Sequence, residues 1–121
     1  MTIYSGYDST IEFEIYGQNQ IPLSATFEAD VKVFPIVKGD STVLTTLTTS
    51  ISVVSSEANT DVSFDQPFVT VISVTFPASV TAGWFESQVI TDLVRTDVDP
   101  DEYMGFQAVI PVMTTITRVG S

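Results

Sequence analysis

The densest run of carboxylates in the chain is RTDVDPDEYMG, residues 95–105, where Asp97, Asp99 and Asp101 alternate with other residues. This spacing is similar to the D-x-D-x-D start of a calcium-binding EF-hand loop, whose side-chain oxygens coordinate the ion. Pro100 interrupts the pattern, no Gly stands at the sixth position, and a strand-like sequence follows instead of a helix. Because Asp and Pro are also turn formers, we expect a solvated hairpin tip here, with an adventitious cation site as the alternative.

Glu12 and Glu14 form a second candidate pair. They are two residues apart in an alternating sequence, which places their α-carbons about 7 Å apart on one face of a strand, within the range for the two carboxylates of a glycosidase. A general acid also needs a hydrophobic pocket that raises its pKa, whereas this face is expected to be solvated. We therefore expect solubilising carboxylates and keep an acid hydrolase only as a remote alternative.

Trp84, the only tryptophan, could stack on a sugar ring if it were exposed. A lone Trp in a β domain is more often part of the core, so we expect it to be buried. Asp92 and Arg95 are close enough in sequence to form an ion pair at a strand end, worth at most about 1 kcal/mol at a surface. No phosphate-binding loop, nucleophile elbow or metal-ligand triad accompanies these residues, and we expect no cofactor.

The composition excludes several further classes of chemistry. The chain of 121 residues fits one domain, residues 1–121, and contains no Cys and no His, which removes thiol nucleophiles, imidazole bases and the usual zinc ligands. The formal net charge of -11 would repel phosphate backbones and anionic lipids, so we expect neither nucleic acid nor a membrane as a partner. The opening residues lack the basic and apolar regions of a signal peptide.

The candidate residues must be positioned by β-strands. Val, Ile, Thr and Phe dominate, and no stretch of twelve residues keeps apolar residues at helical spacing. Alternation predicts strands over 9–16 and 25–34, with turns at 17–20 and 38–41. The inward positions of these strands, together with the tryptophan, give the predicted core: Ile11, Phe13, Ile15, Phe27, Val31, Val33 and Trp84.

The second half of the chain continues in the same way. The Thr-rich segment 42–54 fits either two short strands or one bent strand, because Thr suits both faces of a sheet. Further strands are expected over 69–76, 84–95 and 103–118, joined by the opening stretch, and 77–83 is the one candidate for a helical turn. Seven or eight strands at this spacing predict an all-β, two-sheet antiparallel sandwich, with a small barrel as the alternative.

Several segments together resemble a known family. They are YSGYDST near the start, IPLSA before the second strand, FPASVTAGWF, then DLVRTD and the closing ITR. In this order they resemble the immunoglobulin-like domain of tailed-phage virion proteins, notably the N-terminal domain of baseplate upper proteins and small head or tail accessory proteins. The resemblance spans nearly the whole chain and implies an immunoglobulin-like sandwich. Two departures, GQNQ in place of an Asp-Gly turn and a more charged acidic loop, mean that no contact residue is carried over.

The resemblance implies a non-enzymatic structural protein of a bacteriophage particle, assembled in the host cytoplasm. Within that class we expect a capsid decoration or cement protein on the outer shell, because baseplate and fibre proteins usually append a further domain and this chain stops at residue 121. Its partners would be the major capsid protein or other virion proteins, and further copies of itself. A tail or baseplate adaptor is the runner-up, and a carbohydrate-binding module is a third class. The expected interface residues, near the chain ends, are Ile3, Tyr4 and Val119.

Overall fold

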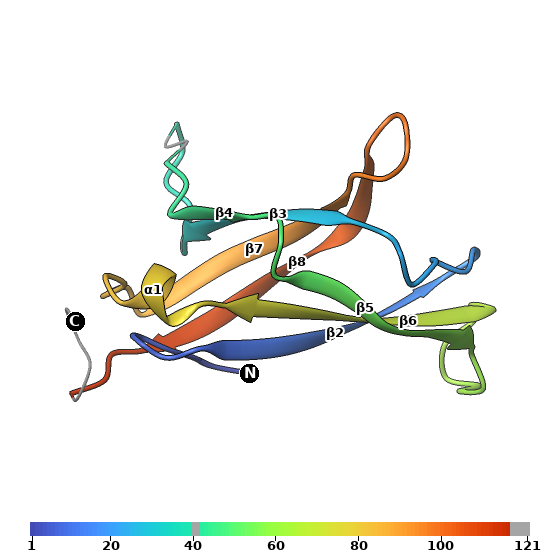
Figure 1. Cartoon of the computed structure of the whole chain (residues 1–121), viewed down its shortest axis with the longest axis horizontal. Helices are drawn as coiled ribbons and strands as arrows, with labels where there is room; N and C mark the ends of the chain where they lie inside the picture. Colours follow the sequence, from blue (N-terminus) through green and yellow to red (C-terminus); the bar gives the residue numbers. More distant parts are fainter. Residues whose placement is uncertain (40–41, 117–121) are drawn as a thin grey trace.

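The computed structural model describes residues 1–39 and 42–116, in which eight strands and one short helix, α1 (Ala78–Thr81), are present. The strands form two separate sheets that pack face to face (Figure 1). The predicted all-β sandwich is therefore confirmed, and the barrel alternative is wrong. In the described part of the chain no helix has the length and apolar character needed to cross a membrane.

The smaller sheet has the strand order β2-β6-β5. Its central strand, β6 (Phe68–Phe76), pairs antiparallel with β2 (Ser9–Gly17) on one side and with β5 (Ile51–Ala58) on the other. The β2–β6 register is continuous, whereas the β5–β6 register is interrupted by a bulge between Val53 and Ser55. The predicted strands for β2 and β6 agree with the structure within one residue at each end.

The larger sheet has the strand order β1-β8-β7-β3-β4. In that order its strands are Ile3–Tyr4, Glu102–Met113, Gln88–Arg95, Phe27–Val33 and Thr45–Leu47. Neighbouring strands pair antiparallel, as predicted, except that the two-residue strand β1 pairs parallel with the end of β8. The Thr-rich segment forms two strands, β4 and β5, in different sheets.

The core lies between the two sheets. Five of the seven predicted core residues are buried there: Ile11, Phe13, Phe27, Val31 and Trp84. Ile15, near the end of β2, is only half-buried and packs against the core. Val33 is wrong as a core residue, because it is 41% exposed. It is the last residue of β3, and at the end of a strand the right place in the alternation does not by itself lead to burial.

Side-chain hydrogen bonds tie the first turn of the chain to α1. Ser5 Oγ donates to the carbonyl oxygen of Thr81 (3.0 Å), and Thr81 Oγ1 accepts from the N–H of Gly6 (3.1 Å). Ser5 and Thr81 are fully buried, so these bonds satisfy polar groups inside the protein. Asp8 Oδ1 accepts from the N–H of Ala78 (2.7 Å) at the start of the helix. The helical turn predicted over 77–83 is therefore present and anchored.

Candidate functional site

The connections between strands gather at the two ends of the sandwich (Figure 1). One end holds the β2–β3, β5–β6 and β7–β8 connections, residues 18–26, 59–67 and 96–101, and we name it the loop end. The opposite end holds the β3–β4 and β6–β7 connections together with β1 and the end of β8. We name it the arm end, because the β3–β4 connection projects from the sandwich there.

The acidic turn at the loop end is a hairpin tip between β7 and β8, as predicted, and Asp97, Asp99 and Asp101 are exposed on it. Arg95 Nε and Nη2 donate to the two carboxylate oxygens of Asp97 at 2.8 and 3.0 Å. This contact, opposed by partial desolvation, lowers the pKa of Asp97 from 3.8 to about 2. The predicted pairing of Arg95 with Asp92 is wrong, because the guanidinium makes its bidentate contact with Asp97 instead.

The alternating aspartates do not converge on a common point. Asp97 faces Arg95 and also accepts the N–H of Thr26 at 3.3 Å, so its oxygens are engaged within the protein. Among residues 1–39 and 42–116, no group of three or more carboxylates lies close enough together to hold a metal ion. The chemistry of the acidic turn is therefore that of a charged, hydrogen-bonded surface.

The β5–β6 loop, also at the loop end, is organised by one side chain, Asn59. Its Nδ2 donates to the carbonyl oxygens of Asp61, Phe64 and Gln66 at 3.1, 2.9 and 2.8 Å. Its Oδ1 accepts from the N–H of Asp61 at 2.9 Å. The loop therefore closes around an amide group and leaves Val62 fully exposed at its tip. The sequence predicted a loop here, but not the role of Asn59 in closing it.

Trp84 is buried, as predicted, and its ring lies edge-on to Phe76 with 6.3 Å between the ring centroids. It lies just beyond the end of α1, and its backbone N–H donates to the carbonyl oxygen of Thr81. With only 4% of its surface exposed, Trp84 cannot present a face for stacking on a sugar. The carbohydrate-binding alternative therefore loses the residue on which it rested.

Glu12 and Glu14 are exposed on the outer face of β2. Glu14 Oε2 accepts from the hydroxyl of Tyr16 (3.0 Å), which raises the pKa of Tyr16. No apolar pocket surrounds either carboxylate, and the nearest depression on the surface, of about 460 Å³, is lined by Glu12 with residues from the start of the chain. The pair has the geometry of solubilising residues on an edge strand.

Exposed apolar side chains gather at the arm end. The described residues there include nine large ones: Met1, Tyr4, Val33, Ile36, Val37, Val43, Phe85, Met113 and Ile116. The described connections of the loop end and the strand residues next to them expose four, namely Leu23, Val62, Phe64 and Tyr103. The sequence carried a signal for this surface, because apolar residues continue through the FPIV segment into a predicted turn. That signal was missed.

Three of these residues together with the neighbouring Pro35 form what we name the arm cluster: Val33, Pro35, Ile36 and Val37. They line a depression of about 230 Å³ together with Lys32 and Thr42. A partner's apolar side chain of ordinary size fits a depression of this volume.

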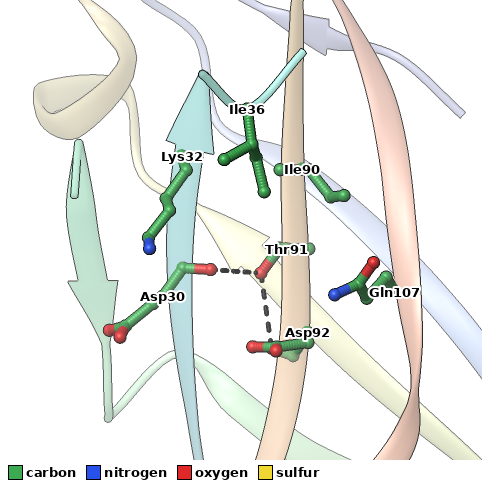
Figure 2. Close-up of a pocket in the computed structure, with 7 residues that line it drawn as sticks. All are labelled: Asp30, Lys32, Ile36, Ile90, Thr91, Asp92 and Gln107. Carbon is green, nitrogen blue, oxygen red and sulfur yellow. Dashed lines mark hydrogen bonds between the residues drawn. The ribbon is translucent and has the colours of Figure 1, made fainter. Parts of the chain in front are cut away.

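A second, shallower depression of about 170 Å³ adjoins the arm cluster on the outer face of the larger sheet. Figure 2 shows Ile36 pointing toward Ile90, with Lys32 on one side and Gln107 on the other. Ile90 is 8% exposed although it lies on the outer face of its sheet, because Ile36 of the β3–β4 connection lies beside it. The hydroxyl of Thr91 donates to the carbonyl oxygen of Asp30 at 3.0 Å, which ties β7 to β3 beneath the depression. Its lining is an aliphatic floor with polar rims, which suits side-chain binding.

The predicted interface residues have different environments. Tyr4 is 45% exposed, as an interface residue requires, whereas Ile3 is fully buried. The prediction for Ile3 is wrong, because β1 pairs with β8 and places Ile3 opposite Val112 in the core. Val119 lies outside the described residues.

A comparison with protein-family models, with curated proteins and with solved structures found no match.

Proposed function

We propose that this protein is a non-enzymatic structural component of a bacteriophage particle, and within that class a capsid decoration protein on the outside of the shell. Its partner would be the major capsid protein, with further copies of the chain arranged by the symmetry of the shell. The observation that carries the proposal is the contrast between the apolar arm end and the acidic loop end.

The strand order supports the immunoglobulin-like resemblance on which the proposal rests. In the immunoglobulin fold, strands B, E and D lie together in one sheet, and strands C, F and G lie in the other. The orders β2-β6-β5 and β8-β7-β3 match these when the strands are taken in sequence, with β4 added beside β3. A β-sandwich with this connectivity hosts many functions, so a binding role has to be supported by features of the surface.

The arm end has the features of a docking surface. The arm cluster is apolar and lies beside Lys32, and two further apolar side chains, Phe85 and Met113, are exposed at the same end. Apolar anchors that fill pockets at the centre of an interface supply most of its binding energy. We infer that the arm end faces the shell, and that the acidic loop end faces the solvent, where its charge keeps neighbouring particles apart.

Reconstitution on particles that lack this protein tests the proposal. Such particles should assemble but release DNA at a lower temperature, and the purified protein should restore the original transition. Val37→Asp places a charge in the arm cluster and should weaken binding to particles by about tenfold or more. Leu23→Asp is the matched control, because Leu23 and Val37 are 65% and 66% exposed at opposite ends of the molecule.

The control variant should bind like the original protein. Equal weakening by both variants would show that the added charge, and not its position, is responsible. Particles that keep their heat stability without this protein but fail to adsorb to host cells would replace the decoration role with a tail or baseplate role.

A further inference from the structure

In the described part of the chain no second strand pairs with the outer edge of β2, although Met1, Thr2 and Tyr4 lie beside its first half, where they line a depression with Thr10, Ile11 and Glu12. β2 pairs only with β6, through nine consecutive residue pairs from Ser9 to Gly17. The N–H of Thr75 on β6 donates to the carbonyl oxygen of Ser50, next to β5. Successive residues of a strand point their backbone groups to opposite sides, so Thr75 points toward β5 and its neighbours on β6 point toward β2. It follows that the N–H and C=O groups of Thr10, Glu12 and Glu14 point away from the sheet. No backbone group of the described residues pairs with them.

The other sheet edges are each shortened or interrupted. β1 has two residues and β4 has three, while β5 carries a bulge. β8 is long, but its register with β7 shifts between Asp92 and Val94, and the extra residues include Gly105 with a φ of 81°. Pro111, also on β8, has no N–H to offer. Bulges, prolines and short strands are the usual protections of a sheet edge against added strands, and β2 has none of them.

The side of the sandwich between β2 and β8 is also incompletely covered. Phe13 of β2 and Phe106 of β8 meet across it with 5.3 Å between ring centroids. Core-packing residues on this side remain only partly buried, namely Ile15, Met104, Phe106 and Ala108. A depression of about 250 Å³ opens here between the ends of the two strands. We name the free edge of β2 together with this partly covered side the open seam.

The first residues of the chain show how a strand fills such a position. β1 lies beside the end of β8, and by pairing there it buries Ile3 completely. It covers only two residue positions of β8, so the seam stays open beyond it. A further extended segment at β2 would extend the smaller sheet and cover the half-buried residues in the same way.

The charges of β2 select the occupant. The side chains of Glu12 and Glu14 are exposed on the outer face, so residues placed opposite them in an added strand would lie against two carboxylates. In an antiparallel pairing of two copies centred on Phe13, Glu12 of one copy would lie opposite Glu14 of the other, which is destabilising. A strand with Lys or Arg at these positions would instead form opposite-charge pairs.

We propose that the open seam is a β-augmentation site, and that it takes an extended segment of another protein in which basic residues alternate with apolar or β-branched ones. The basic residues would lie opposite Glu12 and Glu14, and the alternating residues would pack over Ile15 and Phe106. Main-chain hydrogen bonds to Thr10, Glu12 and Glu14 would hold the segment. This site is distinct from the arm end and does not depend on the proposed function.

A synthetic nine-residue peptide in which lysine alternates with valine and threonine is a suitable probe. Its addition should slow amide hydrogen exchange at Thr10, Glu12, Glu14 and Tyr16 by about tenfold or more, because these N–H groups acquire partners. The double variant Glu12→Lys with Glu14→Lys should weaken binding of the peptide by about tenfold or more. The same peptide N-methylated at alternate residues should not bind, because it cannot donate to the edge.

A basic peptide is attracted to any acidic surface, so a double variant with the same charge change at another place serves as the control. Asp99→Lys with Asp101→Lys alters the exposed turn at the loop end, and should change the affinity by less than about twofold, as expected for screened charges away from the site. Glu14→Pro removes an N–H that points away from β6, so the fold should survive while binding is lost. The proposal would be overturned if the two double-lysine variants weakened peptide binding equally. It would also be overturned if the amides of the β2 edge stayed unprotected from exchange in the presence of the peptide. If the same amides became protected in the protein alone as its concentration rises, the occupant would be a second copy of the chain. That result would overturn the proposal of a basic partner.

Discussion

The two ends of the sandwich are stabilised in different ways. At the arm end, the β6–β7 connection is held by core packing of Trp84 against Phe76, in addition to the buried hydrogen bonds between Ser5 and Thr81. At the loop end, the connections are held by polar side chains, with Asn59 closing one loop and Arg95 holding Asp97 in another. Buried apolar contact is worth more than exposed hydrogen bonds, so equivalent substitutions should have unequal effects at the two ends.

The largest effect is expected at the arm end. Trp84→Ala removes a buried aromatic ring and leaves a cavity, so the free energy of unfolding should fall by about 3 to 5 kcal/mol. Phe85→Ala is the adjacent control, because Phe85 is 60% exposed, and it should cost less than about 0.5 kcal/mol. Urea titration of both variants measures the difference. Similar losses for the two would mean that the packing of Trp84 does not anchor this end.

An intermediate effect is expected in the β5–β6 loop. Asn59→Ala removes the donor shared by three carbonyl groups, and should lower the free energy of unfolding by about 1 to 2 kcal/mol. Hydrogen exchange in the loop should increase more than exchange in the sheets, because the loss is local. Thr60→Ala, at the next position, should change stability by less than about 0.5 kcal/mol. A uniform increase of exchange across the molecule would contradict the local role of Asn59.

The smallest effect is expected in the acidic turn and depends on pH. The pKa of Asp97 is lowered from 3.8 to about 2, chiefly by its hydrogen bonds with Arg95, so the folded state favours the charged carboxylate. Its stabilising contribution is therefore present above pH 4 and is lost as the pH falls toward 2. The stability difference between the original protein and Asp97→Asn should shrink over this range. A difference that stays constant with pH would show that the ion pair does not contribute.

Much of the smaller sheet could be predicted, because its strands follow a regular alternation. Ile11 and Phe13 alternate with Glu12 and Glu14, and a period of two can place them only on opposite faces of a strand. The alternation fails for Val33, since burial requires a covering side chain as well as the right parity. It also fails for Ile3, whose burial depends on pairing with a strand more than a hundred residues away.

The candidate surfaces were less predictable for a similar reason. An apolar segment around Pro35 can be recognised in the sequence, but its exposure follows from the projection of the β3–β4 connection. The bidentate contact of Arg95 was assigned to the wrong aspartate, since both candidates lie within three residues and only the turn geometry distinguishes them. The local sequence limits which partners a side chain such as Arg95 can reach, but it does not decide which of them the side chain contacts.

The sequence by itself determined the β character of the chain, the inward residues of its regular strands and the acidic hairpin tip, because these depend on alternation and turn chemistry over a few residues. Only the tertiary structure decided which strands became neighbours. β2 was left at an edge and β1 joined β8 because long-range pairing is set by how the two sheets close around one core. Glu12 and Glu14 have the same local pattern in any strand, but they flank an open edge only because no other strand reached it.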